Sequence, residues 1–303
     1  MTVAPSLARA ERQGEARHLR FGRTLFDRLE ARLAASTLDA RRGLALAAQL
    51  GAARGALSRR WPAAADVAAL FGTPRFASRR IAFQIAAVEA RNRFVLARTA
   101  GRPLAAFEPL VRWRDPAAVA TLTPPKVLIT AHLGALYLLS AGMDQLPHRR
   151  TILRWSPQHE IGPDVRNANL AGGLAGRTRA LLDALAELRT EGFVSTTIDG
   201  GNGASVPVSV LGFPLDLGVG GFSIAKLAGV EVVPVAAYWE SGGVVCELGR
   251  PVTDPTGAGR WLEAVLRRSP GQITLGLMRR LLFGPPARTP VAHPTPVQLL
   301  ASE

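Results

Sequence analysis

The chain has 303 residues, 48% hydrophobic and 20% charged, a composition that is typical of folded globular proteins and excludes disorder for most of its length. Its single cysteine, Cys246, cannot form an internal disulfide, and no CxxC or HExxH spacing indicates zinc, so we expect a reducing compartment and no metal. The net charge of +14 comes almost wholly from arginine and favours anionic lipid, nucleic acid or phosphorylated carriers such as coenzyme A as partners.

Residues 1–120 are predicted to form an N-terminal helical region that packs on the rest of the protein. Large apolar residues recur every four positions from Phe21 to Leu33 among arginines and acidic residues, which predicts an amphipathic helix with a basic face. Residues 41–57 and 76–97 continue this pattern. Two interpretations of the basic faces stay open: solvated surfaces of core-packed helices, or attachment to anionic lipid headgroups.

Strands and helices alternate in residues 121–285, which predicts an α/β core with a mixed, largely parallel sheet flanked by helices on both faces. The expected strands are 127–130, 151–154, 193–198, 206–211, 232–238 and 244–248, and the expected helices are 134–143, 164–189, 220–228, 262–268 and 273–282. Residues 286–303 are a proline-rich tail for which no structure is expected.

The sequence predicts a cytoplasmic protein attached peripherally to the inner face of the cytoplasmic membrane. Residues 1–20 carry arginines and glutamates where a signal peptide needs an uninterrupted apolar core. The apolar run 127–143 reaches only the lower limit for a membrane span and contains Gly, Ser and His. Nothing in the sequence determines the oligomeric state.

His132 stands at the junction of an expected strand and an expected helix, where open α/β sheets place their chemistry. An imidazole with an ordinary pKa of about 6.5 can take a proton from a hydroxyl near neutral pH, an effect typically worth roughly 10² to 10⁴ in rate. The alternative is a hydrogen-bonded core histidine. A dinucleotide fingerprint, a P-loop and a GxSxG elbow are missing, which disfavours a Rossmann oxidoreductase and a serine hydrolase.

Five segments come in a definite order. They are ITAHLGALYLL at 129–139, ILRWSP at 152–157, TTIDGGNG at 196–203, VSVLGFPLDLGVGGFSIAKLAGVEVVPV at 208–235 and SPGQITLGLMRR at 269–280. Over residues 76–282 this order resembles the bacterial lipid A biosynthesis (lauroyl/myristoyl) acyltransferases and their relatives that acylate phosphatidylinositol mannosides. The resemblance implies an acyltransferase-like fold and acyl transfer from a thioester co-substrate, acyl-CoA or acyl carrier protein, to a hydroxyl or amine of a lipid or glycolipid acceptor. It implies no other cofactor.

The resemblance also implies that His132 is the catalytic base, but one position departs from the family pattern. The family has an acidic residue five positions after the histidine, where this chain has Tyr137. The mannoside-acylating relatives are similar in relying on an acid far downstream, which here corresponds to Asp199 at the end of an expected strand. Asp199 before two glycines is also a common turn residue, and Tyr137 either orients the imidazole or belongs to the core.

Further residues are candidates for substrate binding. Arg154 follows a strand and could hold a phosphate in a forked contact, although a surface arginine fits the pattern equally. Backbone N–H groups at Gly134 are expected to stabilise the oxyanion of a direct attack without an acyl-enzyme. Gly212, Phe213 and the helix from Gly220 are expected to shape an acyl channel and to offer N–H groups to an anion, with packing as the alternative.

Two other classes of function stay open. A catalytically degenerate homologue would bind lipid or acyl carrier without turnover, and it would be favoured if Asp199 lay beyond hydrogen-bond reach of His132. A nucleic-acid-binding protein is suggested by charge alone and is disfavoured because basic and aromatic residues do not interleave. The expected partners are therefore an anionic membrane surface, the lipid acceptor and the acyl carrier, and no nucleic acid.

Overall fold

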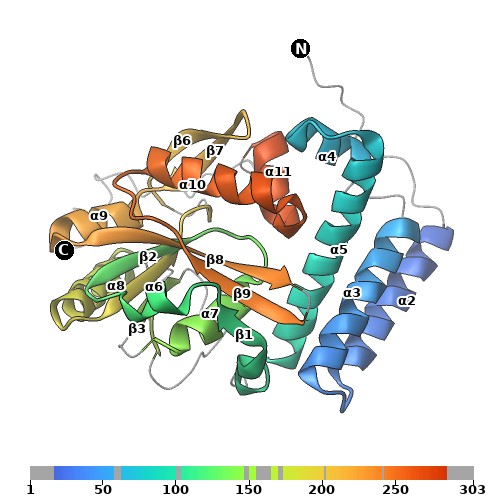
Figure 1. Cartoon of the computed structure of the whole chain (residues 1–303), viewed down its shortest axis with the longest axis horizontal. Coiled ribbons are helices and arrows are strands. Elements are labelled where there is room, and N and C mark those ends of the chain that lie inside the picture. Colours follow the sequence, from blue (N-terminus) through green and yellow to red (C-terminus); the bar gives the residue numbers. More distant parts are fainter. Residues whose placement is uncertain are drawn as a thin grey trace, which may run out of the picture.

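Figure 1 shows a computed structural model that describes residues 17–57, 63–99, 104–146, 150–154, 165–169, 173–200, 203–240 and 242–284. The α-helices are α2 (Arg17–Ala34), α3 (Ala40–Leu57), α4 (Ala64–Phe71), α5 (Arg75–Arg98), α6 (Pro116–Ala120), α7 (Leu136–Asp144), α8 (Gly173–Arg189), α9 (Gly220–Ala228), α10 (Pro255–Arg268) and α11 (Leu275–Phe283). The strands are β1 (Val111–Trp113), β2 (Lys126–Thr130), β3 (Arg150–Arg154), β4 (Val165–Asn169), β5 (Phe193–Thr197), β6 (Ser205–Val210), β7 (Phe213–Gly218), β8 (Glu231–Glu240) and β9 (Gly243–Leu248).

The centre of the fold is a seven-stranded sheet in the order β1-β9-β8-β2-β5-β3-β4. All neighbouring strands are parallel except the antiparallel pair β8 and β9. Strands β6 and β7 form a separate antiparallel hairpin. The expected α/β class, with a mixed and largely parallel sheet flanked by helices, is confirmed.

Strand β2 lies in the middle of the sheet and is covered on both faces. Val127 and Ile129 face one hydrophobic core, to which α4, α8, α9, α10 and α11 contribute, and Leu128 faces a second core formed with α3 and α7. Successive strand residues point to opposite faces, so a strand buried on both faces has a nearly continuous apolar run, here Val127 to Ile129. Helix α5 contributes to both cores, with Ile85 in the first and Val88 in the second. The N-terminal helices therefore share their packing with the sheet.

The structure differs from the expected elements at two places. The expected helix 164–189 is wrong at its start, because β4 occupies 165–169 and α8 begins only at Gly173. The polar sequence of β4 has no strand-like alternation, and its conformation is set by parallel pairing with β3. Strand β1, in the region expected to be helical, is three residues long and pairs with β9.

Three elements of the structure have no counterpart among the elements expected from the sequence, and one expected segment lies outside the described residues. Helices α4 and α6 and strand β7 had no sequence prediction. The proline-rich tail 286–303 lies outside the described residues. Within the part of the chain that the structure covers, no helix combines the length and apolar character needed to cross a bilayer.

Candidate active site

The site is built on two adjacent parallel strands, β2 and β5. Thr130 at the end of β2 is in register with Thr197 at the end of β5, and the Ile198 N–H donates to the Thr130 carbonyl at 2.9 Å. The chain then continues to His132 after β2 and to Asp199 after β5. The carboxyl ends of parallel strands lie at the same edge of the sheet, so this topology brings together two residues that are 67 positions apart.

The Asp199 carboxylate is fully buried and holds His132 at three points. Oδ1 lies 2.8 Å from the imidazole Nδ1, and the backbone N–H of His132 donates to both carboxylate oxygens at 3.0 and 3.1 Å. A guanidinium N–H of Arg280 donates to Oδ2. Because the carboxylate accepts, the proton of the neutral imidazole sits on Nδ1 and the lone pair on Nε2.

The electrostatics of the pair favour the ionised carboxylate. Burial alone would raise the pKa of Asp199, but the charge and hydrogen bonds of His132 and the charge of Arg280 lower it to about 2. The negative charge of Asp199 raises the pKa of His132 above 6.5, against the opposing effects of burial and of Arg280. The His132 side chain is still 38% exposed, so a ligand can reach it.

The loop that carries His132 turns at Gly134, which has φ +53°. A Cβ atom at this position would lie 1.9 Å from the carbonyl oxygen of Ala237 in β8, so a side chain cannot be accommodated. The Gly134 N–H donates to the carbonyl of Gln272 at 2.6 Å, and the amide of Asn92 in α5 donates to the Gly134 carbonyl at 2.9 Å. Strand β8, helix α5 and the segment before α11 thus fix the loop.

The expected role of Gly134 as an oxyanion donor is corrected by this geometry. All four backbone N–H groups from His132 to Ala135 already donate to protein acceptors. Their acceptors are Asp199 and the carbonyls of Ala131, Gln272 and Ala237. A transition-state oxyanion must therefore be stabilised by groups other than these four.

Three residues missed by the sequence analysis support the base. The Arg280 guanidinium binds Asp199, and the Thr274 hydroxyl donates to the His132 carbonyl at 2.5 Å while capping α11. Glu89 of α5 accepts from the backbone N–H of Leu275 at 2.6 Å, at the start of the same helix. Thr274 and Arg280 lie in the SPGQITLGLMRR segment, which carried a signal only through the family resemblance. Glu89 lies inside a helix, and nothing in the surrounding sequence indicated a role at the site.

Tyr137 and Arg154 are the other two candidates from the sequence, the first beside the base and the second for binding a phosphate. Tyr137 is in the first turn of α7, partly buried against the second core, and burial together with the charge of Glu89 raises the pKa of its phenol. The imidazole Nδ1 is held by Asp199, so the hypothesis that the Tyr137 phenol orients it is not needed. Arg154 ends β3, and its side chain lies outside the described residues.

The glycines expected at an acyl channel occupy two different places. Gly212 has φ +82° and forms the tip of the β6–β7 hairpin just before Phe213, where the Leu211 N–H donates to Glu263 of α10 at 2.9 Å. The turn itself thus explains the glycine. Gly220 opens α9 close to Asp199, since the Gly218 N–H donates to the carbonyl of Ile198 at 2.6 Å. The channel role of these residues stays a prediction.

Metal ligands and the cysteine thiol are two further possible sources of chemistry. The described residues contain no group of three or more His, Cys, Asp or Glu side chains arranged to hold a metal ion. Cys246 is buried in β9, and burial raises the pKa of its thiol to about 12, so it is not an activated nucleophile.

Comparisons with known proteins add little to this site. No protein-family model matches the chain, and no curated protein sequence matches it. Among solved structures, the chain is similar to the 1-acyl-sn-glycerophosphate (LPA) acyltransferase PlsC from Thermotoga maritima, with a TM-score of 0.34 and 14% identity over 75% of this chain and 96% of that one. A likeness this weak supports no inference about activity, so we take the function from the site residues.

Replacing Gly134 with Ala should destabilise the protein by more than about 2 kcal/mol, because the methyl group would meet a backbone oxygen of β8 that cannot move away. The matched control is Gly276→Ala in α11, where a Cβ has no neighbour within 4 Å and helix propensity favours alanine. Urea unfolding of both variants measures the difference. Equal stability of the two variants would show that the loop is less constrained than described.

The imidazole of His132 should titrate above 6.5, and Asp199→Asn should lower its midpoint, because the charge that stabilises the imidazolium is removed. NMR titration of the ring protons measures both, with the other histidines as internal references. By linkage, the stability that Asp199 contributes is present above pH 3.8 and is lost as the pH falls toward 2, and the contribution of His132 is lost as the pH rises through its raised pKa. An unchanged midpoint in the variant would contradict the coupling.

Proposed function

We propose that this protein transfers an acyl chain from an acyl thioester, on coenzyme A or acyl carrier protein, to a hydroxyl or amine of a lipid or glycolipid acceptor at the inner membrane surface. The observation that carries the proposal is the contact of 2.8 Å between the half-exposed imidazole of His132 and the buried carboxylate of Asp199. This pairing is the arrangement of a general base and the group that orients it. The reaction class, acyl transfer, is inferred from the order of the five sequence segments that resemble the acyltransferases.

In the proposed reaction, Nε2 of His132 takes the proton of the acceptor hydroxyl while Asp199 stabilises the resulting imidazolium. The oxygen attacks the thioester carbonyl and forms a C–O bond. The tetrahedral intermediate then collapses with cleavage of the C–S bond, and the imidazolium returns the proton to the leaving thiolate. No acyl-enzyme forms, and an amine acceptor would follow the same steps.

We assign the electrostatic stabilisation of the intermediate to Arg280. Its guanidinium binds Asp199 next to His132, and its side chain is 21% exposed, so part of it is accessible to a ligand. A fixed positive charge beside the developing oxyanion would substitute for the backbone donors that the loop does not leave available. The same charge opposes protonation of His132 and helps to keep the base competent.

The alternative functions lose support from this geometry. A degenerate homologue, suggested by Tyr137, would be favoured by an Asp199 out of reach of His132 with no other carboxylate nearby, and the Asp199 carboxylate is in direct contact with the imidazole. Nucleic-acid binding rested on net charge, and many arginines are paired: Arg93 with Glu30, for example, and Arg268 with Glu247.

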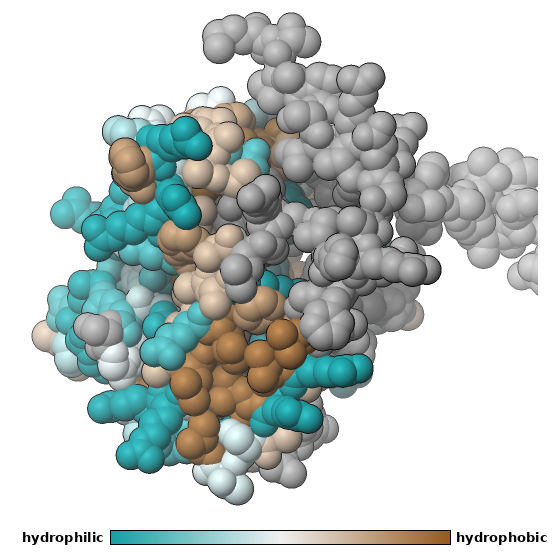
Figure 2. All heavy atoms as spheres, turned by 90° about the vertical axis from the view of Figure 1, so that its right-hand side faces the viewer, coloured by the Kyte–Doolittle hydropathy of each residue, from teal (hydrophilic) through white to brown (hydrophobic). Residues whose placement is uncertain are grey.

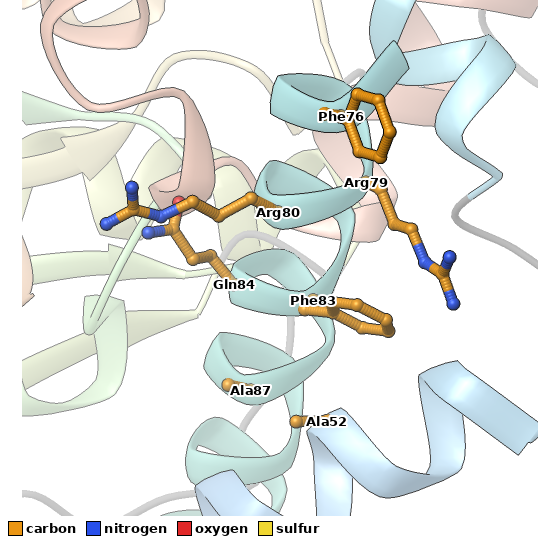
Figure 3. Close-up of a pocket in the computed structure, with 7 residues that line it drawn as sticks. All are labelled: Ala52, Phe76, Arg79, Arg80, Phe83, Gln84 and Ala87. Atoms are coloured by element: carbon orange, nitrogen blue, oxygen red, sulfur yellow. The ribbon is translucent and has the colours of Figure 1, made fainter.

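Peripheral attachment to an anionic membrane is part of the proposal. Phe76, at the start of α5, is 90% exposed, and a cavity of about 440 Å³ lies beside it against α3. Figure 3 shows Phe76, Arg79 and Phe83 on one side of α5, and the Arg79 guanidinium lies 5.7 Å from the centre of the Phe83 ring. On the face that carries α2 and α3, Figure 2 shows apolar side chains bordered by hydrophilic ones. Exposed apolar groups next to guanidinium groups are typical of lipid-facing helices.

Removing the base should abolish transfer. Purified wild-type protein incubated with labelled acyl-CoA or acyl carrier protein and a bacterial lipid extract should form labelled lipid, and His132→Ala should lower the rate by about 10² to 10⁴. In the wild type, kcat/KM should rise with pH through a midpoint above 6.5, because only the neutral imidazole accepts a proton. Gly276→Ala, expressed and purified in the same way, is the control variant for effects of preparation. Transfer at the wild-type rate by His132→Ala would eliminate the mechanism.

Membrane attachment is tested with vesicles of phosphatidylglycerol and phosphatidylcholine. Phe76→Ala should lower the vesicle partition constant, measured by sedimentation, by about 10- to 100-fold, since a buried phenyl ring contributes about 1.5 to 3 kcal/mol. Leu227→Ala in α9 removes a side chain that is 69% exposed and should leave binding unchanged. Pure phosphatidylcholine vesicles should bind the wild type less. Identical partitioning of wild type and Phe76→Ala would place the lipid contact elsewhere.

A further inference from the structure

A second cavity, of about 520 Å³, lies at the carboxyl end of β8, between that strand, helix α5 and the turn after α10. We call it the α5–β8 pocket. Its polar lining residues include Gln84, Arg91, Glu240, Arg268, Ser269 and Gln272, and the ring of Trp239 forms part of its wall. A cavity of this size fits a small molecule or a lipid headgroup rather than a single water.

Arg91 is the unusual residue of this pocket. Its guanidinium carbon lies 5.5 Å from the centre of the Trp239 ring, a cation–π contact. Among the described residues it forms no ion pair within 4.0 Å, whereas Arg93, two positions along the same helix, binds Glu30 at 2.8 Å. Burial lowers the pKa of Arg91, and no carboxylate offsets the effect. A partly buried cation without a counter-charge is a ready site for an anion.

The other charges of the pocket leave it positive. Arg268 also lines it, and this guanidinium donates to Glu247 at 2.7 Å and to the phenol of Tyr238 at 3.0 Å. Glu240 is the one acidic residue among the described lining residues, and its carboxylate is bound by Arg112 and Arg114, which lie on and after β1. Glu240 and Arg268 are thus both matched by partners, and Arg91 is the charged lining residue without an ion pair among the described residues.

The pocket is connected to the His132 loop through shared residues. Gln272 lines the pocket, accepts from the Gly134 N–H at 2.6 Å through its carbonyl, and forms two side-chain hydrogen bonds to the backbone of Trp239. Asn92 bonds the Gly134 carbonyl and also accepts from the Trp239 indole at 3.3 Å. Trp239 is thus hydrogen-bonded to both residues that hold Gly134. A ligand bound against Arg91 and Trp239 would lie next to the residues that fix the His132 loop.

We propose that the α5–β8 pocket binds a phosphate-bearing group, with Arg91 as the principal ligand and Arg268 and the hydroxyl of Ser269 as further donors. The choice of phosphate rests on the proposed function, because both the coenzyme A or acyl carrier thioester and a phospholipid or glycophospholipid acceptor carry phosphates. Guanidinium groups match phosphate geometry with paired N–H donors. The pocket thereby anchors one of the two substrates beside the loop that holds the base.

The test is calorimetric titration of the full-length protein with coenzyme A, with dihexanoyl phosphatidic acid below its micelle concentration, and with inorganic phosphate. We expect at least one of the two organic probes to bind, and Arg91→Gln to weaken that binding at least tenfold. Arg179→Gln is the matched control, since it removes the same charge from α8, where the Arg179 side chain is 80% exposed and lines neither of the two cavities described above. It should bind like the wild type. Tighter binding of coenzyme A would identify the carrier as the source of the phosphate, and tighter binding of phosphatidic acid would identify the lipid.

A spectroscopic measurement controls for folding. Because Arg91 lies over Trp239, probe binding should change the indole emission in the wild type and not in Arg91→Gln, while the circular dichroism of the two stays the same. His132→Ala should bind the probes normally. If the wild type binds the probes but forms no labelled lipid, or if His132→Ala transfers acyl groups at the wild-type rate, the proposed reaction fails and the pocket stands. Equal probe affinity in the wild type and in Arg91→Gln, or no binding of any probe, would overturn the inference.

Discussion

The buried carboxylate of Asp199 is the constraint on which the site depends. A fully buried charge is costly unless it is paired and hydrogen-bonded, and this one is satisfied by the Nδ1 and backbone N–H of His132 and by the Arg280 guanidinium. The same contacts that make burial tolerable fix the tautomer and orientation of the imidazole. Stability and chemistry therefore have a common origin, and removing any member of the cluster would disturb both.

Around this cluster the fold supplies rigidity from elements that are distant in sequence. Gly134 allows the loop to pass against β8, while Asn92 of α5 and Thr274 before α11 bind its carbonyls. The backbone N–H groups from His132 to Ala135 donate to Asp199 and to carbonyls of Ala131, Gln272 and Ala237, so the Gly134 N–H that the sequence suggested for the oxyanion is engaged elsewhere. The loop holds the base firmly and leaves charge stabilisation to side chains.

The large positive charge is not distributed as a uniform surface field. Many arginines are matched with carboxylates, as Arg93 is with Glu30. The cations that stand out are Arg79, next to exposed Phe76, and Arg91, over Trp239 in the α5–β8 pocket. Net charge alone suggests many anionic partners, whereas the exposed Phe76 beside Arg79 and the pocket around Arg91 distinguish two positions on α5 where an anion would be favoured.

The sequence by itself determined the α/β class, because apolar strands and amphipathic helices alternate with distinct periods, and it singled out His132 and Asp199 from their places at strand ends. It failed where local pattern is weak, as in polar β4 and short β1, whose conformation comes from pairing with neighbouring strands. Only the tertiary structure decided that Asp199 touches the imidazole and that Arg280 and Asn92 complete the site. Those contacts join elements far apart in the chain, and a one-dimensional pattern can place His132 and Asp199 at the ends of strands without deciding which side chains meet.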